Sequence, residues 1–135
     1  MSLVEWCEQF ETGHPLVDHQ HQSLFGLMNE LDQALTDGAS EEALWVRLLR
    51  LHELTREHFR CEERLMQELG FPDLPAHRAE HTKIQLNGER LMEQYRRGQL
   101  RLAEALPGRL HGWGIKHILE DDQRMATFIR QQARC

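Results

Sequence analysis

Four stretches of the chain repeat apolar residues every three or four positions, which is the spacing of one face of an α-helix. They cover about residues 18–37, 41–69, 75–97 and 108–132. Short linkers with glycine, serine or proline separate them, and no stretch alternates as a half-buried strand does. The pattern predicts an all-α fold, an antiparallel up-down four-helix bundle. With 135 residues, the chain fits one domain, residues 1–135.

The first residues, 1–18, lack the helical repeat and are interrupted by Gly13 and Pro15. We expect them to form an irregular N-terminal arm that Trp6 and Phe10 pack onto the bundle.

Charge and composition exclude several classes of partner. A formal net charge of −6 argues against nucleic acid and anionic membranes, which require a basic face. No apolar run approaches the roughly 20 residues of a membrane span, and the first residues do not look like a signal peptide. Cys7, Cys61 and Cys135 form no Cys-x-x-Cys motif, so we expect reduced thiols and a cytoplasmic protein.

Each of the four helical stretches has a histidine on its apolar face, and the second and fourth stretches each add an acid. A single histidine on an apolar face is more often a hydrogen-bonded core residue than a metal ligand. Five histidines and two acids on the apolar faces of one bundle do not fit that explanation. Burying five imidazoles and two carboxylates would cost many kcal/mol in desolvation unless a cation bound them. The sequence therefore predicts a metal site. Its candidate ligands are His21, His58, Glu62, His77, His81, His117 and Asp122.

The type of ligand limits the metal. Imidazole and carboxylate without thiolate suit iron, zinc or manganese. Seven ligands are too many for one tetrahedral zinc ion and fit two octahedral ions. Glu62 and Asp122 are the expected bridges, because a carboxylate has two oxygens and an imidazole cannot bridge in this way.

The spacing between His117 and Asp122 conflicts with a regular helix. Five positions at about 100° per residue leave these side chains about 140° apart. We therefore predict a π-type turn or a distorted helix end between the two residues.

The candidate ligands, in this order, resemble those of the hemerythrin family, specifically the single-domain bacteriohemerythrins. The resemblance covers essentially the whole chain. The stretches that carry it are Asp18-His19-Gln20-His21, His58-Phe59-Arg60-Cys61-Glu62, His77-Arg78-Ala79-Glu80-His81, and Trp113 through His117-Ile118 to Asp122.

The resemblance implies a cofactor of two iron ions, cycling between Fe2+ and Fe3+, with an oxo or hydroxo bridge. One iron would be held by three histidines, and the other by two histidines with one coordination position left open. Glu62 and Asp122 would bridge them. The implied function is reversible dioxygen binding, as a carrier, store or sensor rather than an enzyme. The three histidines would be His77, His81 and His117, and the two would be His21 and His58.

The resemblance also implies a dry oxygen pocket beside the open iron. Gly114 is a departure, because the family usually has leucine or another bulky residue near this position. It predicts either a close helix contact or a wider channel with faster autoxidation. The expected pocket residues are Phe25, Phe59, Trp113, Gly114 and Ile118.

The sequence leaves other functions open. A di-iron oxidase or peroxidase related to ferritin would use Glu-x-x-His on two helices, whereas the one match here is Glu11 to His14. Iron or nitric-oxide handling is a further alternative. We expect dioxygen as the ligand and a monomer as the oligomeric state, and a sensing role would need a protein partner.

The other histidines and Cys61 receive ordinary structural interpretations. Cys61 is expected to be a small side chain at the edge of the core rather than a redox-sensing thiol. We expect the remaining histidines on the surface or at helix ends. They are His14, His19, His52 and His111.

Overall fold

The computed structural model describes residues 6–107 and 109–133 of the chain. Every element in these ranges is helical. For residues 110–116, 118–120 and 132–133 only the backbone is described. The elements are η1 (Glu8–Phe10), α1 (Pro15–Thr36), α2 (Glu41–Leu69), α3 (Leu74–Arg96), α4 (Leu102–Ala105) and α5 (Leu110–Ala133).

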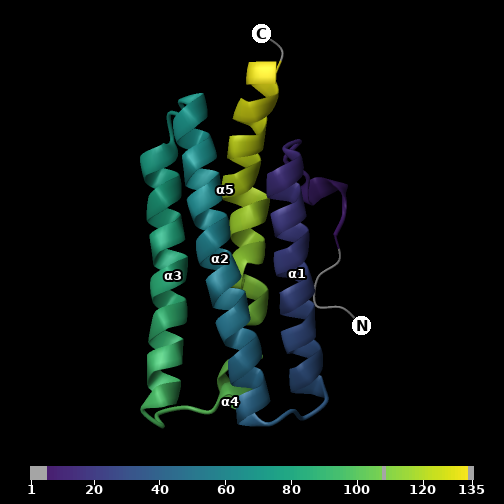
Figure 1. The fold of residues 1–135 in the computed structure, drawn as a ribbon, viewed down its shortest axis with the longest axis vertical. Coiled ribbons are helices and arrows are strands. Elements are labelled where there is room, and N and C mark those ends of the chain that lie inside the picture. Colours follow the sequence, from purple (N-terminus) through teal and green to yellow (C-terminus); the bar gives the residue numbers. More distant parts are fainter. Residues whose placement is uncertain (1–5, 108, 134–135) are drawn as a thin grey trace.

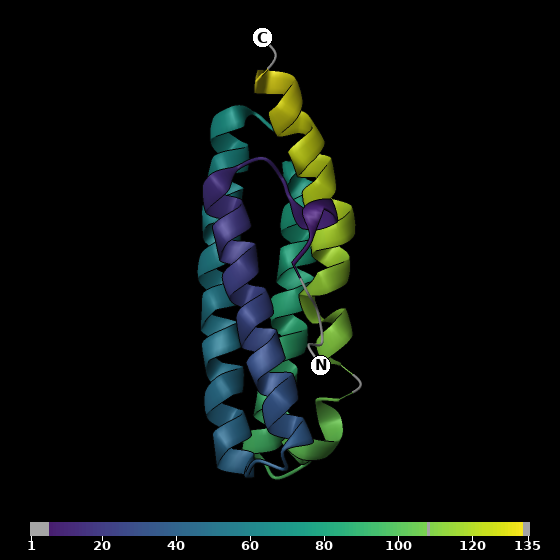
Figure 2. The ribbon, with the colours of Figure 1, turned by 90° about the vertical axis from the view of Figure 1, so that its right-hand side faces the viewer.

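Four long helices form an antiparallel bundle, as predicted (Figure 1). Helix α1 packs against α2, α2 against α3, and α3 against α5, while α5 also packs against α1 and closes the ring. The view from the side shows the N-terminal arm crossing from α1 toward α5 (Figure 2). No helix among the described residues is long and apolar enough to cross a membrane.

The first helix begins at Pro15, three residues before the expected start at Asp18. Proline is compatible with the first turn of a helix, where its missing N–H costs nothing. His14 caps this end, because its Nδ1 accepts a hydrogen bond from the backbone N–H of Val17 at 3.4 Å. The arm is therefore shorter than predicted, and it contains the short helix η1.

The arm is attached to the bundle by aromatic packing, as predicted. Phe10 lies edge-on to Phe25 with ring centroids 4.7 Å apart, and Trp6 also packs edge-on against Phe25 at 5.6 Å. Asp18 fixes the segment between η1 and α1. Its Oδ1 accepts hydrogen bonds from the Thr12 backbone N–H at 2.8 Å and from the Thr12 hydroxyl at 2.7 Å.

Capping side chains and a glycine define the ends of the helices. Ser40 caps α2 through a hydrogen bond from the backbone N–H of Ala43 to its hydroxyl. Gly70 ends α2 with φ +69°, a left-handed conformation that glycine adopts without strain. The fourth predicted stretch forms α5, which begins at Leu110, and a short helix that was not predicted, α4, lies before it at Leu102–Ala105. The Glu41 carboxylate caps α4 by accepting from the backbone N–H of Leu102 at 2.6 Å.

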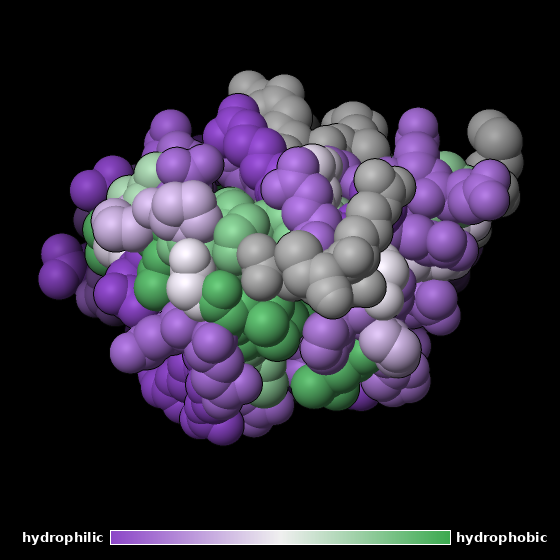
Figure 3. Space-filling view, turned by 90° about the horizontal axis from the view of Figure 1, so that it is seen from above, coloured by the Kyte–Doolittle hydropathy of each residue, from purple (hydrophilic) through white to green (hydrophobic). Residues whose placement is uncertain are grey.

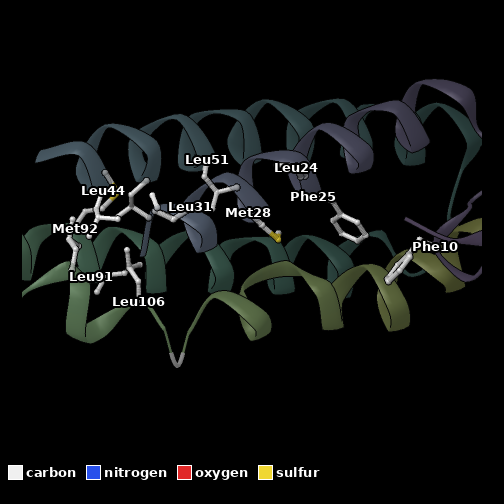
Figure 4. Close-up of a cluster of buried hydrophobic side chains, with 13 residues drawn as sticks. Phe10, Leu24, Phe25, Met28, Leu31, Leu44, Leu51, Leu91, Met92 and Leu106 are labelled. Carbon is white, nitrogen blue, oxygen red and sulfur yellow. The ribbon is translucent and has the colours of Figure 1, made fainter. Parts of the chain in front are cut away.

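Two hydrophobic clusters fill the bundle. The larger one includes Leu31, Leu48 and Leu91 and extends to the end where α4 lies (Figure 4). The smaller one includes Val17, Met66 and Met125. The end of the bundle away from α4, seen from above, shows hydrophobic side chains in its middle and hydrophilic ones around them (Figure 3). Along α1, α2 and α3 the candidate ligands lie between residues of the two clusters, and along α5 they come before Met125 of the smaller one.

Candidate metal centre

The seven candidate ligands converge in the interior of the bundle. His21, Glu62 and Asp122 are fully buried, and the other four side chains are at most 6% exposed. One helix supplies one of them and the other three long helices supply two each. A buried cluster of this composition requires either protons or a metal cation to offset the desolvation of its charges.

The seven side chains form two groups that share both carboxylates. Within each group the ligand atoms all lie within 4.8 Å of one another. The shared carboxylates give the arrangement expected of two neighbouring ions bridged by Glu62 and Asp122. One group is Glu62, His77, His81, His117 and Asp122, and the other is His21, His58, Glu62 and Asp122.

Helical spacing explains most of this convergence. His58 and Glu62 lie four residues apart on α2, and His77 and His81 repeat that spacing on α3, so each pair projects from one face. The predicted π-type turn on α5 is wrong. The helix is regular α from Leu110 to Ala133, and the Nε2 atom of His117 still lies 3.0 Å from Asp122 Oδ1. The length of the imidazole side chain spans the angular offset, so the backbone stays regular.

Hydrogen bonds outside the centre orient three of the imidazoles. The Nδ1 atom of His58 donates to the Gln20 side-chain carbonyl at 2.7 Å. His81 Nδ1 donates to Glu63 Oε2, and His117 Nδ1 donates to Asp121 Oδ2, both at 2.9 Å. A neutral ring that donates through Nδ1 has its lone pair on Nε2, which here faces the interior. This is the usual arrangement for metal-ligating histidine.

The inward-facing nitrogens approach one another closely. The Nε2 atoms of His81 and His117 lie 3.0 Å apart, and those of His21 and His58 lie 2.9 Å apart. When their Nδ1 atoms carry the protons, neutral His81 and His117 present only acceptors to each other. A cation placed among these lone pairs removes the repulsion.

The two shared carboxylates supply the strongest test of a metal. Asp122 Oδ2 lies 2.9 Å from His21 Nε2, and Asp122 Oδ1 lies 2.9 Å from His77 Nε2. These distances are within hydrogen-bonding range, but neither Asp122 oxygen makes a hydrogen bond among the described residues. The Oε2 atom of Glu62 is also buried without a hydrogen-bond partner among the described residues. Buried carboxylate oxygens that lie beside imidazole nitrogens without a hydrogen bond fit metal ligation.

Without metal, the carboxylates hold protons on the imidazoles. Burial alone would lower the pKa of His21, but the nearby Asp122 and Glu62 carboxylates raise it to about 9. The same balance raises the pKa of His77 to about 9 and that of His117 to about 11. Burial would raise the pKa of the carboxyls of Glu62 and Asp122, but the imidazoles hold both below their usual range.

The predicted oxygen pocket is described only in part. Phe59 lies flat against the His81 ring, with centroids 3.8 Å apart. Phe25 is buried one helical turn after His21 and contacts the arm. The other three predicted residues lie outside the described side chains. They are Trp113, Gly114 and Ile118.

Several residues differ from their expected roles. His52 is buried, not on the surface, and its pKa is lowered, chiefly by desolvation. His14 is a cap and His19 is exposed, as predicted, and His111 lies outside the described side chains. The outer partners of the imidazoles were not predicted. They are Gln20, Glu63 and Asp121, each adjacent in sequence to a candidate ligand.

Known proteins are similar to this chain in sequence and in fold. The family described as the Hemerythrin HHE cation binding domain matches residues 12–129. The chain belongs to the hemerythrin family. A bacteriohemerythrin of Methylococcus capsulatus is 30% identical over 125 residues, which is 91% of this chain and 94% of that protein. One from Stenotrophomonas maltophilia is 27% identical and covers 96% of this chain and 84% of its own length.

Solved structures agree with the family assignment. The crystal structure of wild-type hemerythrin superposes on this chain with a TM-score of 0.86 and 26% identity, covering 93% of this chain and 97% of that one. A hemerythrin mutant gives a TM-score of 0.87. The chain is thus a hemerythrin-family cation-binding domain over nearly its whole length, and its buried donor set fits the non-haem metal site of that family.

Proposed function

We propose that this hemerythrin-family protein binds dioxygen reversibly at a non-haem di-iron centre. The observation that carries the proposal is the pair of buried ligand groups that share Glu62 and Asp122. Two adjacent positions, joined by two carboxylates and otherwise surrounded by imidazole, suit a pair of iron ions better than a single ion of any kind. The bacteriohemerythrins to which the chain is similar support the same function.

The two positions would differ in how many protein ligands they have. His77, His81 and His117 would hold one ion together with the shared carboxylates, giving five protein ligands. His21 and His58 would hold the other, giving four. With one solvent-derived oxo or hydroxo bridge, the first ion would be six-coordinate and the second would keep an open position. When bound, the iron pair supplies this open position and the two electrons that dioxygen requires.

The surrounding protein would keep the centre dry. Hydrophobic clusters lie on both sides of the ligand layer, and Phe59 covers the His81 ring. Excluding water would limit proton transfer to dioxygen at the centre. It would thereby limit the loss of dioxygen in a reduced form such as peroxide. The Glu62 and Asp122 carboxylates would offset part of the charge of the two ions in this medium, where unpaired charge is costly.

The ligand set favours binding over oxidative catalysis. The di-iron centres of ferritin-like bundles are rich in carboxylates, whereas this centre contains five histidines and two carboxylates. A carrier, a store and a sensor would all use the same site. We propose a monomer in the cytoplasm, in keeping with the free thiols of Cys7 and Cys61.

An optical spectrum tests the proposal. The protein would be loaded with ferrous iron without oxygen, exposed to air, and then deoxygenated. We expect a visible absorption band that appears with air and vanishes on deoxygenation over repeated cycles. Irreversible conversion to a diferric form, with consumption of an added reductant, would instead support an oxidase.

A further inference from the structure

The outer hydrogen-bond partners of the imidazoles differ in charge between the two metal positions. In the three-histidine group, two of the rings donate to carboxylates: His81 to Glu63 and His117 to Asp121, both at 2.9 Å. In the two-histidine group, His58 donates to the neutral amide oxygen of Gln20 at 2.7 Å. The Nδ1 atom of His21 is buried and has no hydrogen-bond partner among the described residues.

The outer carboxylate on the α2 side is held in place. Glu63 directly follows the candidate ligand Glu62 and points about 100° away from it around α2, so it reaches His81 on α3 at the ring edge outside the centre. Its second oxygen accepts from Arg78 Nε at 2.8 Å. Glu63 is 22% exposed and Arg78 52%, so this carboxylate is partly shielded from water while its cationic partner is well solvated.

The outer carboxylate on α5 has a similar arrangement. Asp121 lies four residues after His117, on the same face of the helix, and its side chain is 17% exposed. Its other oxygen accepts from Arg124 at 3.3 Å, and Arg124 is largely exposed. Two helices thus independently place an arginine-fixed carboxylate behind a histidine of the same metal position.

We propose that Glu63 and Asp121 are positioning residues that make the three-histidine position more electron-rich than the two-histidine position. The proposal rests on the di-iron assignment above. An imidazole that donates to a carboxylate is a stronger ligand than one that donates to an amide, and its ring cannot rotate away from the metal. The higher oxidation state is therefore stabilised at the three-histidine position, which would have no open coordination position for dioxygen. The open position, with Gln20 behind it, remains the weaker donor set.

Zinc-loaded protein tests the hydrogen bonds without redox chemistry. Zinc is diamagnetic, so the Nδ1–H protons of the ligating rings can be followed by NMR. We expect the protons of His81 and His117 at lower field than that of His58. Glu63→Gln should move the His81 proton upfield and leave the His58 proton in place. Identical shifts for all three protons in the wild-type protein would overturn the proposal.

Metal competition gives a second readout. With a chelator of known affinity, Glu63→Gln and Asp121→Asn should each weaken one of the two zinc ions about 10- to 100-fold, the range seen for outer partners of metal ligands. The matched control is Glu93→Gln. Glu93 is an exposed glutamate that also pairs with arginine, at Arg96 and Arg97, but it lies near the end of α3 away from the ligands. It should leave both affinities unchanged.

A charge placed at the other position makes the test symmetric. Gln20→Glu keeps the size and the acceptor atom but adds a carboxylate behind His58. The reduction potential of the iron-loaded centre should rise in Glu63→Gln and fall in Gln20→Glu. In Gln20→Glu the His58 proton should move to the low field of the other two. A potential that moves no more in these variants than in Glu93→Gln would contradict the proposal.

The two hypotheses fail in different ways. If the wild-type protein does not bind dioxygen reversibly but the zinc protons shift as described, the proposed function is wrong and the positioning role stands. If dioxygen binds reversibly and the zinc protons and affinities do not respond, the positioning role is wrong and the function stands.

Discussion

Phe59 stacks on His81 with an interplanar angle of 7° and a centroid distance of 3.8 Å. Phe59 belongs to α2 and directly follows the candidate ligand His58, while His81 belongs to α3. The contact therefore joins two helices of the centre through a flat hydrophobic surface. Together with the Glu63 hydrogen bond at the ring edge, it leaves the His81 imidazole one orientation, with Nε2 toward Glu62 and His117.

Phe59→Leu should loosen this ring. We expect a loss of about 1–2 kcal/mol in the free energy of unfolding, because a smaller side chain leaves a gap and the ring stacking is lost. We also expect about tenfold weaker metal binding at the three-histidine position, in line with other changes to the shell outside the ligands. Urea unfolding and chelator competition measure the two effects.

The control for this variant is Phe128→Leu. Phe128 packs on Phe71 in the smaller cluster, and Phe71 in turn lies edge-on to His77 with ring centroids 6.2 Å apart. It should lower stability by a similar amount and leave metal affinity unchanged. An equal loss of affinity in both variants would mean that Phe59 acts through general stability alone.

The helical architecture was predictable because periodicity and caps agree along the chain. Ser40, Gly70 and the apolar stripes all indicate the same helices. The start of α1 was missed because Pro15 was interpreted as an interruption, although proline fits a first helical turn. The burial of His52 was also visible in principle, since it lies four residues after Leu48 on the same face of α2.

The convergence of the seven candidate ligands was predictable because seven polar groups on apolar faces would be too costly to bury without a bound cation. The regular geometry of α5 between His117 and Asp122 was not, because a backbone angle does not show how far a side chain reaches. Glu63 and Gln20 contact histidines on other helices, so local sequence gives no signal for them. Asp121 could have been found, since it lies four residues after His117.

As the pH rises, the stability of the metal-free protein should fall and its affinity for metal should increase. In the metal-free protein the folded-state pKa of His21 and His77 is about 9 and that of His117 about 11, above the unfolded value of 6.5. Stability from these groups is complete below pH 6.5 and is lost as pH rises through these values. Metal binding needs the neutral rings and releases their protons, so apparent affinity should rise over the same range.

Two measurements over about pH 6.5–8.5 check this. Urea unfolding of the metal-free protein should show stability that falls with pH, and chelator competition should show zinc affinity that increases. Metal-free stability that rises across this interval would contradict the carboxylate–imidazole pairing described above.

A shared ligand should matter more than an unshared one. Glu62→Ala removes a side chain from both groups, so we expect less than one iron per chain after loading. His21→Ala removes a ligand from one group only and should leave about one iron per chain. His52→Gln alters a buried histidine outside both groups and should leave two. Iron and protein assays on the same samples give these ratios. Equal losses in Glu62→Ala and His21→Ala would argue against bridging.

Gly114 gives a prediction from the sequence alone. The resemblance to the family implies a bulky residue near this position, so Gly114→Leu should narrow a channel to the proposed open iron. We expect slower oxidation of the oxygenated protein in air, followed as the decay of its visible band. An unchanged decay rate would mean that Gly114 serves only close helix packing.

The central claim is that Glu62 and Asp122 join two metal positions of unequal composition, and anomalous scattering at the iron edge locates those positions directly. Crystals of the iron-loaded protein should show two peaks per chain. Both should contact the two carboxylates, one should be flanked by His77, His81 and His117, and the other by His21 and His58. A single peak, or a second peak away from these side chains, would contradict the account.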